Sequence, residues 1–464
     1  MPTATETPAS PMVPKPTPAQ IAQSLKPHVG RKIGFVHLGC PKNLVDTETM
    51  LGLLEADGHQ IVGDEADADV MLVNTCAFID SAQKESIQVL ANLAEGGKKL
   101  LVTGCLAQKF QSELLDLFPE AEAVVGIHSV PDIANIVRRT ATGERVTATQ
   151  QDPTFVLEDD TVRRHVTMGA WAYLKIAEGC DYKCSFCIIP SMRGAFRSRD
   201  VENVLDNARK LVDRGVKEVI LVGQDTTSYG KDIGSSLAEL LFRLSTEVDG
   251  MEWLRFMYAY PNLVNDDLLT VIREQKNIVK YMDVPLQHTH PSVLKRMRRP
   301  VMDHVAFSQH IRESVPGIKL RTGFIVGFPG ETEEEFQHLK AAMTEARWDR
   351  LGVFEYSDVD TSHSKTLENK VDKATIKRRR GELMALQQQI AFEENQKLIG
   401  QTVNVIVDEI NAYGQATART QWDAPEVDNS VLVKVGEGQI ILPGEILPVR
   451  ITHAGPYDVK AVLA

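Results

Sequence analysis

The most informative stretch of the chain lies at residues 171–187, which read WAYLKIAEGCDYKCSFC. A short apolar run leads directly into three cysteines spaced Cys-x3-Cys-x2-Cys, namely Cys180, Cys184 and Cys187. Zinc sites usually reach four ligands by pairing knuckles, whereas this single loop offers three thiolates and no obvious fourth. Three thiolates on a cubic four-iron cluster leave one iron open to a substrate or cofactor. The spacing therefore favours an iron–sulfur cluster over a structural zinc or an incidental group of cysteines.

Strand-like runs alternate with helical segments around this motif. From about Val166 onward, six apolar runs follow one another, with amphipathic segments such as residues 201–215 between them. Six β/α units in series predict an open or partial barrel whose working face lies at the carboxyl ends of its strands. The expected strands are WAYLKIA (171–177), KEVILVG (217–223), WLRFMYAY (253–260), KYMDVPLQ (280–287), LRTGFIVGF (320–328) and RLGVFEYS (350–357).

Three further cysteines precede this barrel. Cys40, Cys76 and Cys105 each end a short apolar run, and helical segments separate the runs. Nearly all-apolar strands alternating with helices predict a parallel sheet that is buried on both faces. Because parallel strands place their carboxyl ends along one edge, where open α/β folds bind ligands, the three thiols can converge on a second cluster. Taken alone, strand-end cysteines are more often buried packing residues.

The chain changes character again after Gly400. Short β-runs separated by Gly, Pro and Asn predict a small antiparallel β-barrel. These runs are TVNVIVDEI (402–410), SVLVKV (430–435), QIILP (439–443) and ILPVRIT (446–452). The fold class expected for the whole chain is α/β. The expected parts are a Pro/Thr-rich disordered tail (1–30), an open parallel α/β domain (31–147), a linker (148–165), a partial (β/α)6 barrel with a long terminal helix (166–397) and the small β-barrel (398–464).

Composition excludes several classes of protein. The chain has 51 Lys and Arg against 63 Asp and Glu, a net charge of −12, which argues against a sequence-blind grip on nucleic acid but leaves a local basic groove open. No apolar stretch approaches the ~20 residues that cross a bilayer, and the first 30 residues lack the apolar core of a signal peptide. We therefore expect a cytoplasmic protein with no membrane partner, whose six cysteines are metal ligands or redox groups.

The motif at residues 180–187 resembles the signature of the radical S-adenosylmethionine (SAM) enzymes. That resemblance implies a reduced 4Fe–4S cluster to which SAM binds. The segments GCPKNLVDTE (39–48), NTCAFIDSAQKES (74–86) and VTGCLAQ (102–108) resemble the amino-terminal domain of the methylthiotransferase family, and the last domain resembles the TRAM barrel that closes these enzymes. The resemblance spans essentially the whole chain after residue 30. It implies two 4Fe–4S clusters, the second held by Cys40, Cys76 and Cys105.

The methylthiotransferases divide by substrate into enzymes that modify tRNA adenosines and enzymes that modify an aspartate of ribosomal protein uS12. Pro41-Lys42-Asn43 looks like the protein-modifying branch, since the tRNA branch usually reads Gln-Met-Asn, and residues 423–428 (DAPEVD) resemble the same branch. Residues 400–464 hold eight acidic and four basic residues, a net charge of −4, which suits docking onto a basic protein and would repel RNA. A merely solvated acidic surface is the alternative. We expect uS12 as the substrate and no stable nucleic-acid binding; a tRNA adenosine methylthiotransferase is the second hypothesis.

The resemblance also implies the course of the reaction. One SAM would donate a methyl group to a sulfur at the amino-terminal cluster. A second SAM would supply the radical that removes a hydrogen from the aspartate β-carbon, which then takes up the methylthio group. Both clusters must then face one cavity. We assign no side chain as a catalytic acid or base, and the sequence points to no particular electron donor.

Polar residues at the ends of later strands are the candidate contacts to SAM. Gln224 and Asp225 follow the second barrel strand, and Gln287 ends the fourth. Gly327 lies in a strand–turn–helix segment that contacts the adenosine in radical SAM barrels. Arg197, which follows the cysteine loop, is suited to bind a carboxylate of the cofactor or the substrate. Each of these positions also fits an ordinary structural role in a loop.

Two basic runs, at residues 295–299 and 377–380, raise the question of RNA binding. Both lie in helical or linker contexts, so we expect them on solvated faces. The sequence contains no Gly-rich phosphate loop ending in Lys-Ser/Thr and no nucleophile elbow.

Overall fold

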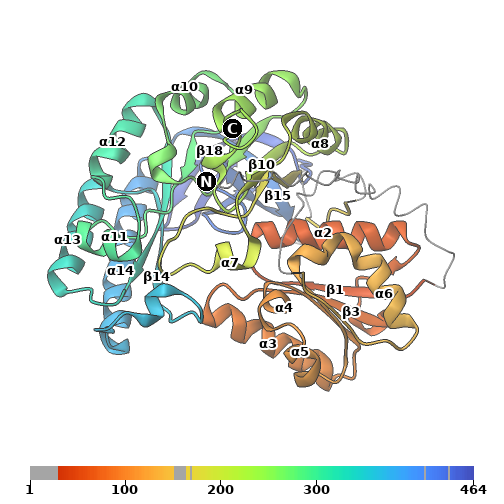
Figure 1. Cartoon of the computed structure of the whole chain (residues 1–464). Helices are drawn as coiled ribbons and strands as arrows, with labels where there is room; N and C mark the ends of the chain where they lie inside the picture. The colour runs from red at the N-terminus through yellow and green to blue at the C-terminus, as the bar shows by residue number, and fades with distance from the viewer. Residues whose placement is uncertain (1–29, 151–162, 168–169, 412–413, 437–438) are drawn as a thin grey trace, which may run out of the picture.

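The structure, a computed structural model, describes residues 30–150, 163–167, 170–411, 414–436 and 439–464. An open parallel sheet, a larger curved α/β domain and a small closed β-barrel follow one another along the chain (Figure 1). The expected fold class and the order of its three parts are confirmed. Nearly all of the expected tail and most of the expected linker lie outside the described residues, and the exact domain boundaries stay a prediction.

The amino-terminal domain is a parallel sheet in the order β2-β1-β3-β4-β5-β6. Strands β3 and β4 are completely buried, which explains their nearly unbroken apolar runs. Helices α2 and α6 cover one face of the sheet, and α3, α4 and α5 cover the other. The strands are β1 (Lys32–His37), β2 (Gln60–Ile61), β3 (Val70–Thr75), β4 (Leu100–Gly104), β5 (Ala121–Val125) and β6 (Val146–Ala148). The helices are α2 (Pro41–Ala56), α3 (Asp80–Glu95), α4 (Cys105–Phe110), α5 (Glu113–Leu117) and α6 (Ile133–Ala141).

The central domain contains the six expected barrel strands. They form two parallel three-stranded sheets, β11-β10-β7 and β12-β13-β14, which are joined where Leu254 pairs with Ile278. The partial barrel is therefore confirmed. Its strands are β7 (Trp171–Lys175), β10 (Glu218–Val222), β11 (Trp253–Phe256), β12 (Tyr281–Asp283), β13 (Lys319–Val326) and β14 (Arg350–Glu355). A short antiparallel pair, β8 (Ala177–Glu178) and β9 (Arg197–Ser198), flanks the cysteine loop and helix α7 (Ile189–Arg193).

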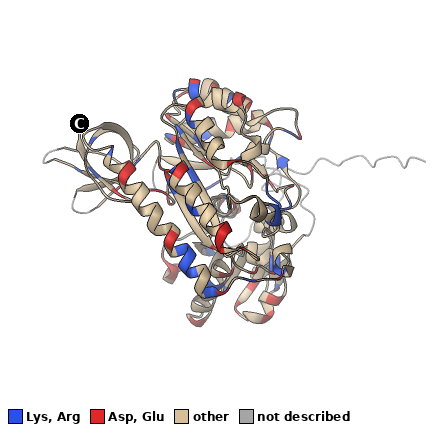
Figure 2. Cartoon of the chain, turned by 90° about the vertical axis from the view of Figure 1, so that its left-hand side faces the viewer, with Lys and Arg blue, Asp and Glu red and all other residues tan. Residues whose placement is uncertain are grey.

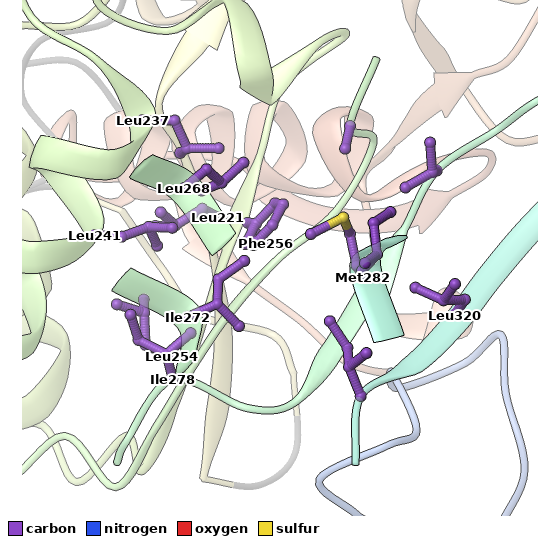
Figure 3. Close-up of a cluster of buried hydrophobic side chains, with 14 of the residues drawn as sticks. Leu221, Leu237, Leu241, Leu254, Phe256, Leu268, Ile272, Ile278, Met282 and Leu320 are labelled. Atoms are coloured by element: carbon purple, nitrogen blue, oxygen red, sulfur yellow. The ribbon is translucent and has the colours of Figure 1, made fainter. Parts of the chain in front are cut away.

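Helices pack on the outer face of the barrel. Outward-facing side chains such as Leu221 and Phe256 contact Leu237, Leu268 and Ile272 from the surrounding helices in one continuous apolar core (Figure 3). No helix in the described ranges is long and apolar enough to pass through a bilayer. The helices are α8 (Val201–Asp213), α9 (Leu237–Glu247), α10 (Asp266–Glu274), α11 (Pro291–Met297), α12 (His304–Ser314), α13 (Glu333–Ala346) and α14 (Lys373–Gln396).

The inner face of the barrel is filled by the other two domains. Because side chains alternate along a strand, Tyr173 and Tyr281 point away from the outer core and belong to a separate apolar cluster. Leu44 and Val45 of α2 enter that cluster from the amino-terminal domain, and Ala424 enters it from the last domain. The barrel interior is thus a packed junction of all three parts.

The carboxy-terminal domain is a closed barrel in the order β15-β16-β17-β19-β18. Four of its strand pairings are antiparallel, whereas β17 and β19 pair in parallel. The expected strand at residues 439–443 is wrong, because this segment is irregular and exposes Ile440 and Leu442. Its last residue, Pro443, lacks the N–H that a strand pairing would use. The strands are β15 (Thr402–Ile410), β16 (Gln415–Thr420), β17 (Val431–Lys434), β18 (Ile446–Ala454) and β19 (Val459–Leu463).

Candidate cluster-binding site

The three amino-terminal cysteines lie at the carboxyl ends of neighbouring strands. Cys40 precedes α2, Cys76 follows β3, and Cys105 is the first residue of α4. Gly39, at φ +100°, brings the first loop over the second: a Cβ added there would lie 2.9 Å from Cys76 Cβ and 3.1 Å from its Sγ. Only glycine combines this backbone conformation with so close an approach. The structure thus brings these cysteines to one edge of the sheet, as the strand pattern predicts.

The electrostatics of this sheet edge favour the binding of a positively charged metal group. Burial raises the pKa of Cys105 to about 12 and also raises the pKa of Cys76. Burial acts on Cys40 in the same direction, but the charges of Lys42 and Arg193 outweigh it and hold the Cys40 pKa below its ordinary value. Negative charge on Cys40 further raises the pKa of both other thiols. Three crowded thiolates need metal charge to be stable here, and an iron–sulfur cluster supplies it.

The second triplet, Cys180, Cys184 and Cys187, forms a compact loop after β8. The Cys187 amide donates to the Cys184 carbonyl at 3.0 Å, and the Ile189 amide donates to Cys187 Sγ at 3.4 Å. Burial raises the pKa of Cys180 to about 11 and that of Cys187 to about 12. Burial disfavours a free thiolate here, whereas the N–H···S bond stabilises negative charge on Cys187 Sγ, which a metal-bound sulfur also carries.

Neither triplet forms a site for one metal ion. Among the residues that the structure describes, no three His, Cys, Asp or Glu side chains gather around a single-ion position. A tetrahedral zinc with Zn–S bonds of ~2.3 Å requires sulfur atoms roughly 3.8 Å apart. A four-iron cube places each thiolate on a separate corner and needs a wider spread. Each triplet offers three thiolates, the number that a four-iron cluster with one open iron requires, and a cluster at each triplet stays a prediction.

Helix α7 connects the two cysteine triplets. Cys187 lies two residues before its first residue, and Arg193 at its end places Nη2 3.9 Å from Cys105 Sγ. Met192 packs in the same apolar cluster as Cys105. A helix of five residues spans only about 7.5 Å, and it lies between the two domains in Figure 1. Both triplets therefore border one short element at the domain junction.

A buried charge network joins the domains at the same place. Arg193 donates to Glu178 at 2.9 Å and to Asp46 of α2 at 3.2 Å, and Lys175 also binds both carboxylates. Gln224 Nε2 donates to Glu178 at 2.7 Å. Burial would raise the pKa of Glu178, but Arg193 and Lys175 hold it well below its ordinary range. Two cations facing two anions fix the relative position of the domains without leaving a net charge.

Three of the predicted SAM contacts lie at the carboxyl ends of the barrel strands, and they differ in the hydrogen bonds that they already form within the protein. Asp225 accepts from Thr227 and from Ser228 within its own loop, so its carboxylate already has structural partners. Gln224 has a buried Oε1 with no hydrogen-bond partner among the described residues. Gln287 is half-buried at φ +73°, where its backbone extends the pairing with β13. A SAM-binding role for all three stays a prediction.

Gly327 and Arg197 have structural tasks as well. A Cβ at Gly327 would lie 2.3 Å from Ile376 Cγ1, and its amide donates to the Glu331 carboxylate at 2.5 Å. Burial raises the pKa of that carboxyl to about 7. Arg197 donates to the carbonyls of Ala195 and Arg193, while its buried Nε has no partner among the described residues. The role of both in SAM binding also stays a prediction.

The acidic side chains of the DAPEVD segment face the barrel interior and do not add to the surface charge of the last domain. Asp423 binds Arg350 of β14 at 2.6 Å, and Asp428 binds Arg321 of β13 at 3.2 Å. Glu426 accepts from the Tyr173 hydroxyl at 3.2 Å. These acids point into the barrel and neutralise its own arginines, so the sequence-derived charge of the last domain does not describe its surface.

Most basic side chains of the two runs are exposed, as expected, but each run also contributes an arginine to an internal ion pair. Arg296 binds Glu335 at 2.7 Å, and Arg379 binds the buried Glu331 at 3.1 Å. Along α14 the run at 377–380 lies toward the start of the helix, and acidic positions lie toward the end that joins the small barrel (Figure 2). The ion pairs of Arg296 and Arg379 were not predicted from the sequence, because a basic run is usually a solvated face.

Family models match each part of the chain. Residues 32–126 match the "Uncharacterized protein family UPF0004", residues 174–342 match the "Radical SAM superfamily", and residues 399–463 match the "TRAM domain". The fold is similar to that of the radical SAM methyltransferase TsrM from Kitasatospora setae, solved with cobalamin and a [4Fe–4S] cluster. That likeness has a TM-score of 0.53 at 15% identity and covers 70% of this chain and 75% of TsrM.

Curated relatives match over nearly the full length. The ribosomal protein uS12 methylthiotransferase RimO of Synechococcus sp. (strain CC9902) is 46% identical, over 93% of this chain and 94% of the relative. The RimO of Crocosphaera subtropica (strain ATCC 51142 / BH68) is also 46% identical, over 92% and 97% respectively. Identity at this level over the whole architecture shows more than a shared fold. The chain belongs to the RimO family of radical SAM methylthiotransferases, and an iron–sulfur cluster and SAM are the cofactors of that superfamily.

Proposed function

We propose that this chain attaches a methylthio group to the β-carbon of an aspartate in ribosomal protein uS12. The observation that carries the proposal is the arrangement of six cysteines as two triplets that border the same short helix, α7. Relatives that share nearly the whole length of the chain bear the name of this activity. The charge of the last domain no longer contributes, since its DAPEVD acids face inward.

The proposal assigns one 4Fe–4S cluster to each triplet. Cys180, Cys184 and Cys187 would hold the cluster that binds SAM, and the amino-terminal cysteines would hold the second. When bound together with SAM, these clusters would supply the radical chemistry and the transferred sulfur, and SAM would supply the methyl group. The protein contributes the spacing between them, because the network around Arg193 and Glu178 locks the two domains together. Burial of that network also keeps water from the junction.

Lys42 is the residue of this junction best placed to meet an anionic substrate. Its ammonium nitrogen lies 3.4 Å from the centre of the Tyr258 ring, at the carboxyl end of β11. Lys42 is two residues from Cys40 and has no carboxylate partner within the described part of the chain. We assign it to the orientation of the target side chain, whose carboxylate would complement the ammonium charge.

The protein would act in the cytoplasm, without stable binding to nucleic acid.

The test supplies both candidate substrates to the same enzyme. Anaerobically reconstituted protein is incubated with reductant, SAM and either a uS12 peptide or a modified tRNA. We expect the mass of one methylthio group on the peptide, located at the aspartate by fragmentation, and none on a peptide with alanine at that position. Modification of tRNA alone would overturn the substrate assignment. A failure to form 5′-deoxyadenosine with either substrate would overturn the radical chemistry.

A further inference from the structure

Arg299, in the basic run 295–299, lies against the SAM-side cysteine loop. Its Nη1 is 3.9 Å from Cys184 Sγ, and its Nη2 donates to the Pro285 carbonyl at 2.5 Å. The guanidinium carbon lies 4.1 Å from the centre of the Tyr260 ring. Tyr260 in turn stacks on Tyr182 of the cysteine loop, with ring centres 3.6 Å apart and planes 4° from parallel. The side chain is therefore held in place by three different contacts.

The charge of Arg299 is uncompensated, unlike that of the arginine at the other triplet. Arg193, beside Cys105, is bound by Glu178 and Asp46. No carboxylate in the described part of the chain forms an ion pair with Arg299, and its buried Nε lacks a hydrogen-bond partner there. Arg299 thus presents to Cys184 a positive charge that no ion pair among the described residues offsets.

We propose that Arg299 sets the reduction potential of the cluster at Cys180, Cys184 and Cys187. Reduction adds one electron from the external donor to the cluster, and a nearby fixed cation stabilises the added negative charge more than it stabilises the oxidised form. The Tyr182–Tyr260 stack limits solvent around the guanidinium, which preserves the strength of this interaction. The inference rests on the cluster assignment made above and is independent of the substrate.

The experiment measures the potential of one cluster at a time. In a Cys76→Ala background, which isolates the cluster of interest, Arg299→Met removes the charge at nearly constant length. Reductive titration followed by electron paramagnetic resonance should show a midpoint lowered by a tenfold change in the redox equilibrium, about 59 mV. Arg299→Lys should recover much of the shift. Lys295→Met, which removes an exposed charge from the same run, should leave the midpoint unchanged.

An unchanged midpoint in Arg299→Met would overturn the proposal. If SAM affinity measured by calorimetry falls at the same time, Arg299 is instead a ligand for the SAM carboxylate. Where Arg299→Met does not assemble its cluster, Arg299→Gln, which keeps a donor for the Pro285 carbonyl, gives the same measurement. A normal shift together with no modification of uS12 would count against the proposed function alone.

Discussion

We expect the Cys76→Ala protein, after anaerobic reconstitution, to hold about half of the iron and labile sulfide of the wild type. Cys76 shares the sheet edge with Cys40 and Cys105, and the other triplet forms a separate loop that directly precedes α7. Loss of one thiolate should therefore empty one site and spare the other. Methylthiolation of the uS12 peptide should disappear, whereas cleavage of SAM to 5′-deoxyadenosine should continue. Iron and sulfide analysis with product quantification checks all three outcomes.

The reciprocal variant, Cys184→Ala, is the matched control. It should also retain about half of the iron, but it should lose the formation of 5′-deoxyadenosine. The double variant should hold essentially no iron. Full iron in Cys76→Ala would show that the amino-terminal cysteines are packing residues, and complete loss of iron would show that the two sites are not independent.

Replacing Glu218 with glutamine should cost about 3–5 kcal/mol of stability at the junction of the barrel and the last domain. Glu218 is completely buried and lies between two arginines, with Arg255 Nε at 2.7 Å and Arg419 Nη1 at 2.9 Å. Burial would raise the pKa of this carboxyl, but both cations hold it below its ordinary value. An amide would leave two buried guanidinium groups without their shared anion. The thermal unfolding midpoint should fall, and limited proteolysis should reach the last domain sooner.

Glu247→Gln provides the comparison, because Glu247 forms an exposed ion pair with Arg243 on the barrel surface. Exposed pairs contribute little, so this variant should unfold like the wild type. Equal behaviour of the two variants would mean that the Arg255–Glu218–Arg419 contact does not hold the domains together. Iron content, measured on both proteins, separates a loss of domain contact from a loss of clusters.

The sequence revealed those parts of the fold that depend on local pattern. The three strand-end cysteines could be placed on one edge because parallel strands alternate with helices in a fixed sense. Strand β2, with two residues, is too short to show a pattern. Residues 439–443 have the composition of a strand, yet Pro443 and the exposed Ile440 belong to an irregular segment. The composition of a segment alone does not show which of its apolar residues a neighbouring strand will cover.

The candidate site was foreseen only where its residues are close in the sequence. The triplet at 180–187 is a loop motif, and its spacing carries the chemistry. By contrast, Lys175 and its partner Asp46 are separated by 129 positions and meet only when two domains dock. A Lys and a Glu inside an otherwise apolar run at 171–178 were the available signal, since buried charges require partners. No such signal marked Arg299, because a run of cations looks the same in the sequence whether its side chains are exposed or lie against the cysteine loop.

The insertion of residues 423–428 into the barrel bears on how the chain matures during translation. Arg350 of β14 finds its carboxylate on Asp423, and the Tyr281 hydroxyl donates to Asp428 at 2.7 Å. A nascent polypeptide that has emerged only as far as α14 already contains every barrel strand but not these partners. The packing of the barrel interior can therefore be completed only after residues 423–428 have left the ribosome. Synthesis of the last domain is thus the step that completes the enzyme's centre.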